Sequence, residues 1–402
     1  MLRHPFAGGV TRESLIDWYR AMRARTHQIF DLITPDAYYD RPIALRNPIV
    51  FYEGHLPAFS VNTLVKLTLK GEGIHPHFEL IFERGIDPDS EASVTCPTDL
   101  WPARADVQAY GAEADALIER TLANGDIGID GGEAVFTVIE HELMHQETLL
   151  YMFHQLPCSK RVGSSQLAVG SGELLPTANR QLPTRVKIPR GRVTLGNSPE
   201  YFGWDNEFPA LVVDVEAFEV DAYNVTNGEY LEYIKATGTK APHFWKCVDG
   251  EWRRRGFFEL APLPVNAPVY VTHDEATAYA RWKGARLMTE AEWHRAASGT
   301  PSGNYGFEYW DPVDVGLYPP SDFGVYDLVG NGWEWTSTPF GPFPGFEPMP
   351  SYRVYSADFF DNAHFVMKGA SPVTPRELIR PSFRNWFRPN YPYVYATFRC
   401  AR

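Results

Sequence analysis

Hydrophobic positions in the first 155 residues recur at the spacing of amphipathic helices. Between residues 12 and 34, apolar side chains fall mostly three or four positions apart, as they do on one face of a helix. The same spacing predicts helices over residues 48–69, 103–123 and 133–155. Four amphipathic helices in succession predict a four-helix bundle that occupies residues 1–157.

Polar residues and prolines mark the limits of two of these helices. Asp130 offers an N-cap oxygen to the last helix, and Glu133 is placed to complete a capping box with it. Pro157 stops that helix. Pro57 lies inside the second helix, where it removes a backbone hydrogen bond, so we expect a kink beside His55.

From residue 183 onward the pattern changes to short apolar runs between closely spaced turns. Residues 186–196 are typical of a strand, a turn and a second strand, whereas 274–283 and 289–297 favour short helices. This pattern predicts a mixed domain at 183–402 and an α+β fold class for the chain. Residues 158–182, rich in Ser, Gly, Thr, Gln and Pro, are interpreted as a linker.

Composition narrows the possible partners. The net charge of the 402 residues is −13 and there is no long basic run, so a nucleic acid or an anionic membrane is not expected as a partner. The first residues do not resemble a signal peptide, and no apolar run has the length of a membrane span. Four scattered cysteines favour a reduced, cytoplasmic setting over a disulfide scaffold.

The stretch His-Glu-Leu-Met-His, residues 141–145, carries the strongest chemical signal. His141 and His145 are four residues apart, so both imidazoles lie on one helical face, where they can chelate a metal. In a bundle, further ligands come from facing helices, which makes His55 the natural third ligand. Weaker candidates are His75, His77 and His154.

Two other interpretations of this stretch stay open at this point. His-Glu-x-x-His is also the signature of zinc peptidases, in which the glutamate serves as general base. Alternatively, the helix carries two ordinary histidines and no metal, because short motifs produce false positives.

The second half of the chain resembles the formylglycine-generating-enzyme/sulfatase-modifying domain, a variant of the C-type lectin fold. The matching stretches are Asp205-Asn-Glu-Phe-Pro, Val225-Thr-Asn-Gly-Glu-Tyr, Ala285-Arg-Leu-Met-Thr-Glu-Ala-Glu-Trp and Gly324-Val-Tyr-Asp-Leu-Val-Gly-Asn-Gly-Trp-Glu-Trp. Formylglycine-generating enzymes use cysteines near the end of this domain, but residues 367–374 contain none. Formylglycine generation is therefore not expected.

The first half resembles a DinB-type helical bundle. A DinB bundle followed by this lectin-like domain is similar to the ergothioneine/ovothiol sulfoxide synthase family, whose members are non-haem iron(II) enzymes. They join a chalcogen donor to a histidine derivative with O2. The resemblance implies Fe(II) as the cofactor, held by His55, His141 and His145. A protein with a lectin-like ligand site and no turnover is the alternative from another class.

The same resemblance assigns substrate residues in the second half. The family's Asn-Trp pair, which holds the trimethylammonium group of hercynine (Nα-trimethylhistidine), corresponds to Asn385 and Trp386, followed by Phe387. An indole face attracts a quaternary ammonium group through a cation–π contact. A catalytic tyrosine of the family corresponds to Tyr352, within Tyr-Arg-Val-Tyr, as a proton or hydrogen donor.

Departures from the family pattern bear on the chalcogen donor. Where enzymes that use γ-glutamylcysteine carry an acid and a base, this chain has Phe387 and Tyr391. Where they carry arginines, it has the acidic residues Asp87, Asp89 and Glu91. These differences suggest a selenosugar donor and make the chain most similar to the selenoneine synthase branch, which forms a C–Se bond. The alternative is an ergothioneine-type sulfoxide synthase, with a thiol donor and a C–S bond.

Overall fold

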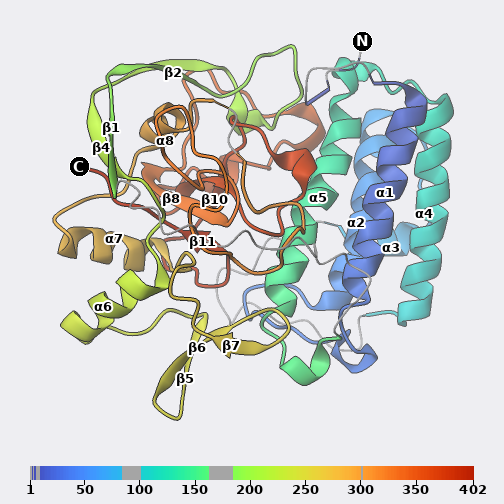
Figure 1. Cartoon of the computed structure of the whole chain (residues 1–402). Coiled ribbons are helices and arrows are strands. Elements are labelled where there is room, and N and C mark those ends of the chain that lie inside the picture. Colours follow the sequence, from blue (N-terminus) through green and yellow to red (C-terminus); the bar gives the residue numbers. More distant parts are fainter. Residues whose placement is uncertain (1, 3, 6–9, 84–100, 163–183, 300–301) are drawn as a thin grey trace. The chain divides into compact units, whose positions relative to one another are not determined.

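The computed structural model describes the chain except for residues 1, 3, 6–9, 84–100, 163–183 and 300–301. The chain divides into two compact units. The first comprises Met1–Ser164, Glu200–Phe202 and Met349–Arg353, and the second contains the remaining residues. Figure 1 shows long helices in the first unit and short strands, helices and many loops in the second. The predicted α+β fold is confirmed.

The first unit is a helical bundle, as the periodicity predicted. Its helices are α1 (Arg12–Phe30), α2 (Ile49–Ser60), α3 (Pro76–Ile81), α4 (Arg104–Asn124) and α5 (Glu133–Phe153), with a π-helical turn η2 (Val61–Thr68) directly after α2. Short 3-10 turns are η1 (Pro35–Ala37), η5 (Ile129–Gly132), η6 (Cys158–Lys160) and η8 (Pro350–Tyr352). In Figure 1, α1, α2, α4 and α5 are the long helices of the bundle.

Helix α2 is the central helix of this unit. Every residue from Ile49 to Ser60 is buried, and a helix that is apolar on all sides has to be covered by its neighbours. The neighbours include α3, α4 and α5. Pro57 lies inside the helix, which continues to Ser60 and passes into the π-helical turn at Val61.

One predicted helix end and one predicted helix cap were wrong. The first helix ends at Phe30 and does not reach residue 34. The last helix has no capping box, because its N-cap is Gly132 with a left-handed backbone (φ 81°) and Asp130 is left-handed as well (φ 49°). Glu133 is therefore the first helical residue, and its carboxylate is free to bond elsewhere.

The described residues of the second unit form four small sheets. Its strands are β1 (Arg185–Ile188), β2 (Gly191–Leu195), β3 (Leu211–Val215), β4 (Phe218–Asp221), β5 (Trp245–Val248), β6 (Glu251–Arg255), β7 (Leu260–Pro262), β8 (Gly332–Pro339), β9 (Phe365–Ala370), β10 (Asn385–Phe387) and β11 (Ala396–Thr397). The largest sheet has the order β10-β9-β8-β11, with β11 parallel to β8 and the other pairs antiparallel. The sheets β1-β4, β2-β3 and β5-β6-β7 are antiparallel.

Three helices accompany these sheets: α6 (Asn227–Thr237), α7 (His273–Trp282) and α8 (Glu290–Ala296). The remaining 3-10 turns are η7 (Asp205–Glu207), η9 (Ala357–Phe359) and η10 (Arg376–Leu378). The strand, turn and strand expected in 186–196 are present, but β1 and β2 pair with β4 and β3 rather than with each other. The helices expected in 274–283 and 289–297 are present as α7 and α8.

Buried ion pairs hold the second unit together. Arg399 donates to Glu334 at 2.7 Å, and Arg384 donates to Glu290 at 3.0 Å. Arg380 donates to Glu207 at 2.9 Å. Burial raises the pKa of Glu207, but Arg380, the Ser382 hydroxyl and the Trp204 backbone together hold it below its usual value. Several family motif residues thus serve the fold, because Glu207 and Glu334 belong to the stretches quoted above.

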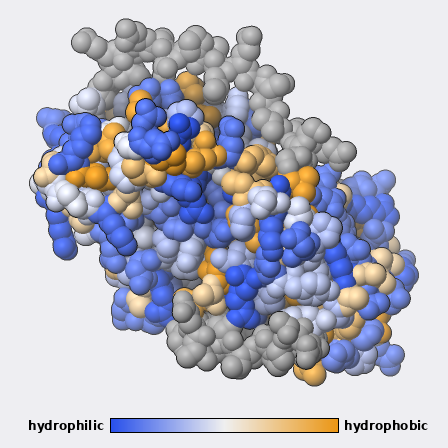
Figure 2. Space-filling view, turned by 90° about the horizontal axis from the view of Figure 1, so that it is seen from below, coloured by the Kyte–Doolittle hydropathy of each residue, from blue (hydrophilic) through white to orange (hydrophobic). Residues whose placement is uncertain are grey.

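In the described part of the chain, the exposed apolar side chains are spread over many elements. Large apolar side chains that stay exposed belong to many segments: Tyr39, Leu67, Leu80, Ile129, Val162, Val212, Val265, Trp282 and Val354. Figure 2 shows hydrophobic residues in small groups among hydrophilic ones on the face it presents. Among the described residues, no helix combines the length and hydropathy of a membrane span. The cytoplasmic location stays a prediction.

Candidate metal centre

The bundle brings together the three histidines that the sequence singled out. His55 comes from α2, and His141 and His145 come from one face of α5. One ring nitrogen of each lies within 4.8 Å of the corresponding nitrogens of the other two. His55 and His141 are each 3% exposed, so the cluster is largely shielded from water. Three converging imidazoles are a donor set that suits a transition metal.

A backbone carbonyl fixes the orientation of His55. Its Nδ1 lies 2.8 Å from the carbonyl oxygen of Phe82, so Nδ1 carries the proton and donates, which leaves Nε2 for a metal. This approach depends on Gly54, because a Cβ there would overlap the Phe82 ring. The sequence did not point to Gly54 or Phe82, since their contact joins two segments that are 28 residues apart.

Aromatic rings hold the imidazoles from the sides. Phe59 stacks on His141 with 3.6 Å between ring centroids, and Phe51 stacks on His55 at 4.9 Å. Burial, then the neighbouring His55 and Arg46, hold the pKa of His145 well below its usual value. A neutral imidazole is the form that binds a metal. Among the described residues, the buried Nδ1 of His145 has no hydrogen-bond partner.

The weaker histidine candidates lie outside the cluster. His75 caps α3, where its Nδ1 accepts a hydrogen bond of 3.1 Å from the backbone of Phe78. His154 follows the last turn of α5 as its C-cap. The described residues contain one group with metal-ligand spacing, and neither His77 nor these two belongs to it.

Glu142 argues against the peptidase interpretation. Its carboxylate accepts hydrogen bonds from Arg23 at 3.0 Å and from Thr26 at 2.6 Å, and Arg23 also bonds Asp115 at 2.8 Å. Glu142 is 1% exposed. A peptidase needs this glutamate next to the metal and its water as a general base, whereas here it belongs to a buried ion-pair network with α1.

Tyr352 lies beside the histidine cluster. Its short turn η8 belongs to the same compact unit as the bundle. The Tyr352 ring centroid is 6.1 Å from that of His141 and 5.1 Å from that of Phe59. The structure thus places this tyrosine near the imidazoles, while its catalytic role stays a prediction.

The second unit holds the residues assigned to the substrate. Trp386 stacks on Phe340 with 4.1 Å between centroids and an angle of 6° between the rings. Tyr355 and Phe359 lie at 5.3 and 5.6 Å from Trp386, so four aromatic rings gather here. The Oδ1 of Asn385 accepts a hydrogen bond of 2.9 Å from the backbone of Trp386, which leaves its amide group to donate.

The structure describes some of the residues that bear on the choice of chalcogen donor. Phe387 stacks on Tyr391 with 5.0 Å between centroids and 17° between the rings, which gives an aromatic surface next to Trp386 in the chain. Arg388 lies 4.0 Å from Asp361. The acidic residues Asp87, Asp89 and Glu91 lie outside the described residues.

Comparison with protein families matches both halves of the chain. Residues 19–149 match the model of the DinB superfamily. Residues 171–402 match the model of the sulfatase-modifying factor enzyme 1-like domain. Both resemblances inferred from the sequence are thereby confirmed.

Similarity to individual proteins extends over nearly the whole chain. The hercynine oxygenase of Mycolicibacterium smegmatis is 35% identical, over 98% of this chain and 99% of that protein. The hercynine oxygenase of Mycobacterium tuberculosis is also 35% identical, over 75% of this chain and 78% of that protein. Ergothioneine biosynthesis protein 1 of Neurospora crassa is 29% identical over 92% of this chain, which spans 55% of that longer protein.

Proposed function

The chain belongs to the family of the hercynine oxygenases and ergothioneine biosynthesis proteins, and from this membership we propose that it is an iron(II)- and O2-dependent enzyme acting on hercynine. In the proposed reaction, one C–H bond of the imidazole and the S–H bond of a thiol donor are broken. A C–S bond and an S–O bond form, and the second oxygen atom of O2 leaves as water. The product is a sulfoxide, and O2 is the only oxidant required.

The histidine cluster carries this proposal. His55, His141 and His145 present three nitrogens within 4.8 Å of one another in a buried setting. Three neutral imidazoles leave further positions open on a bound iron, where O2 and a donor can meet. The chain's own contribution is to hold the imidazoles by the Phe82 carbonyl and by the stacked rings of Phe51 and Phe59.

The aromatic group around Trp386 supports hercynine as the substrate. A trimethylammonium group has no hydrogen to donate, so aromatic faces are its natural partners. Trp386, Tyr355 and Phe359 offer such faces, while Phe340 covers one side of the indole and fixes its orientation. We assign Asn385, Trp386 and Phe387 to substrate binding and Tyr352 to proton or hydrogen donation.

The proposal has two forms, which differ in the chalcogen donor. The name of the Neurospora crassa relative refers to ergothioneine, a sulfur compound, so we place a thiol donor and C–S bond formation first. A selenosugar donor and C–Se bond formation are the second candidate. The observation that favours it is the stack of Phe387 on Tyr391, because an aromatic surface suits a sugar better than a dicarboxylate.

One competition experiment distinguishes these candidates. The iron-loaded protein is given hercynine and O2 with γ-glutamylcysteine, cysteine or a 1-selenosugar, and the products are identified by mass spectrometry. Preference for a thiol supports the first form and rejects the selenium form, whereas preference for the selenosugar does the reverse. A protein that consumes neither O2 nor hercynine with any donor would instead fit the ligand-binding alternative.

A further inference from the structure

One face of helix α5 carries more than the two histidines. Glu133, Thr137, His141 and His145 follow one another at intervals of four residues, so their side chains lie along the same side of the helix. Glu133 was expected to cap the helix and does not. Its carboxylate instead binds a segment that is distant in the sequence, and this use is not explained by helix formation.

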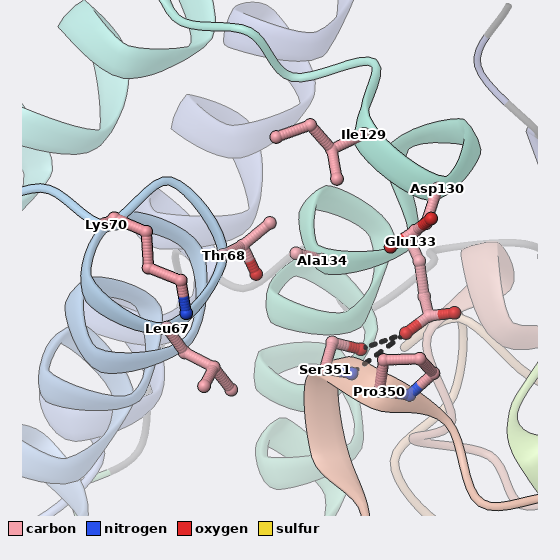
Figure 3. A pocket seen from close by; sticks show the side chains of 9 residues that line it. All are labelled: Leu67, Thr68, Lys70, Ile129, Asp130, Glu133, Ala134, Pro350 and Ser351. Atoms are coloured by element: carbon pink, nitrogen blue, oxygen red, sulfur yellow. Dashed lines mark hydrogen bonds between the residues drawn. The ribbon is translucent and has the colours of Figure 1, made fainter.

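The partner of Glu133 is Ser351. The backbone N–H of Ser351 donates to Oε1 of Glu133 at 3.0 Å, and the Ser351 hydroxyl donates to the same oxygen at 2.7 Å. Figure 3 shows both bonds. The Thr137 and Ser351 hydroxyls are 3.1 Å apart. Because the Ser351 hydroxyl gives its proton to Glu133, the Thr137 hydroxyl is the donor in that contact.

Ser351 is the residue before Tyr352. Both belong to the turn η8 (Pro350–Tyr352), so fixing the backbone and side chain of Ser351 restricts where the Tyr352 ring can lie. That ring contacts Phe59 and lies 6.1 Å from the His141 ring. The same rigid helix therefore carries two metal-ligand candidates and the attachment point of the tyrosine that faces them.

We propose that Glu133 and Thr137 are positioning residues that hold Ser351 and thereby set the Tyr352 ring against the metal centre. The catalytic part of this inference rests on the proposed function, whereas the placement of Tyr352 can be measured without turnover. A shift of about 1 Å in a reacting group can cost about 100-fold in rate, so the bonds that fix Ser351 in the turn η8 should affect the rate of the reaction.

The surroundings of Glu133 distinguish this role from core packing. Glu133 and Ser351 border a hollow of about 230 Å³ that is also lined by Thr68, Lys70 and Asp130 (Figure 3). Shortening Glu133 enlarges a hollow that is already open to solvent and leaves no void in a packed core. Loss of the carboxylate should thus release the Ser351 turn with little effect on the bundle.

The first test measures the position of Tyr352 directly. The full chain is prepared with 3-fluorotyrosine at position 352 and loaded with cobalt(II) in place of iron, and the fluorine resonance is recorded before and after loading. We expect cobalt to broaden or shift the resonance strongly in the unaltered protein and much less in Glu133→Ala and Ser351→Ala. Glu133→Gln, which keeps the acceptor oxygen, should restore the cobalt effect.

Two results of this experiment would overturn the proposal. A cobalt effect of the same size in Glu133→Ala and in the unaltered protein shows that the bond does not place the ring. Absence of the effect in the unaltered protein, or failure of cobalt to bind, removes the premise that Tyr352 faces a metal. Asp130→Asn is the matched control for charge, since Asp130 borders the same hollow, whereas the backbone N–H and hydroxyl of Ser351 donate to Glu133.

The second test concerns turnover. Glu133→Ala should lower kcat by about 10- to 100-fold while the KM for hercynine changes little, because the substrate residues are elsewhere in the chain. In a Tyr352→Phe background, Glu133→Ala should have no further effect on kcat, since the bonds between Glu133 and Ser351 act on turnover only through the Tyr352 hydroxyl. Additive losses would contradict the proposal, and absence of hercynine turnover in the unaltered protein would reject the proposed function alone.

Discussion

Gly54 illustrates how one residue without chemistry of its own prepares the site. The absence of a side chain at Gly54 admits the ring of Phe82, and the Phe82 carbonyl oxygen accepts a hydrogen bond from His55 Nδ1. The stacked Phe51 holds the other side of this imidazole. Loss of such an outer contact typically weakens metal binding about 10- to 100-fold.

We therefore predict that Gly54→Ala weakens metal binding about 10- to 100-fold and lowers the free energy of unfolding by about 1–3 kcal/mol. The matched control is Gly111→Ala, also inside a bundle helix, where the nearest atom to an added Cβ is 3.7 Å away. The control should be neutral or up to about 1 kcal/mol more stable, because alanine favours helix over glycine. Equal metal affinity in both variants would show that the Phe82 contact is dispensable.

The Trp386 side chain gives a prediction about the substrate. Trp386→Ala should weaken hercynine binding up to about tenfold or somewhat more, given a cation–π contribution of about 0.5–2 kcal/mol. The metal content should not change, and histidine without its methyl groups should bind poorly to the unaltered protein. Isothermal titration with hercynine and histidine measures both effects, and equal affinity for the two ligands would remove this role from Trp386.

At the residue level, the sequence was informative where a motif or a regular spacing carries the role. The four-residue interval selected His141 and His145. His55 was added because metal ligands in a helical bundle come from facing helices. The supporting contacts escaped prediction, because Phe82 reaches His55 and Phe340 reaches Trp386 across separate segments. Such contacts depend on packing, which no local pattern in a single sequence reports.

Helix α5 is the element in which fold and site are most closely joined. One side presents His141 and His145, and the next residue after each, Glu142 and Gln146, bonds to α1. Thr26 of α1 donates to Glu142 and accepts from Gln146 at 3.0 Å. This polar contact fixes the rotation of α5 about its axis, and with it the direction in which the histidines point.

We predict that Arg23→Ala destabilises the protein by about 3–5 kcal/mol, because it leaves the buried carboxylate of Glu142, and the half-buried one of Asp115, without their cation. Arg20→Ala is the control, since its ion pair with Glu119 is exposed and its loss should change the stability far less. Urea unfolding of both variants provides the measurement. A loss below about 1 kcal/mol for Arg23→Ala would mean that this network does not hold the helices.

A buried acid in the second unit gives a prediction about pH. Burial raises the pKa of Asp327 from 3.8 to about 6. The folded chain then holds the proton of Asp327 more tightly than the unfolded chain does. Deprotonation of Asp327 therefore lowers the free energy of unfolding as the pH rises above 3.8 and through about 6. The free energy of unfolding of Asp327→Asn, relative to that of the unaltered protein, should therefore rise by about 1 kcal/mol from pH 5 to pH 8.

The control for this experiment is Asp249→Asn. Asp249 has the same left-handed backbone as Asp327 (φ 51° and 52°), but it lies at an exposed hairpin turn. Because Asp249 is exposed, this variant makes the same change from aspartate to asparagine without the effect of burial. Urea unfolding at both pH values measures the effect, and a pH-independent difference for Asp327→Asn would contradict the assigned pKa.

Element boundaries were predicted less well than element types. Periodicity located the four bundle helices and the start of α5 at Glu133, yet the predicted capping box was wrong because three consecutive left-handed residues, Asp130 to Gly132, precede the helix. In the second unit the strands β1 and β2 were found, but their partners β4 and β3 were not. Pairing depends on contacts between strands that hydrophobic alternation within one strand does not encode.

For the whole molecule, the order of its parts was the most informative feature. The helical bundle with its histidines precedes a lectin-like domain, and this combination separated the chain from peptidases. The absence of cysteine from residues 367–374 separated it from formylglycine-generating enzymes. The structure adds a physical reason for the first distinction, because Glu142 is committed to Arg23. The donor was not determined, since three of the residues that bear on it, Asp87, Asp89 and Glu91, lie outside the described part of the chain.

The central claim is that the cluster of His55, His141 and His145 holds an iron that is needed to oxidise hercynine. Mass spectrometry of the hercynine-derived product, formed with iron(II), O2 and a donor, tests it most directly in the unaltered protein, in His55→Ala and in the exposed control His27→Ala. The account predicts a hercynine–donor adduct from the unaltered protein and the control, and none from His55→Ala. Equal product from His55→Ala, or unchanged hercynine in all three reactions, would contradict it.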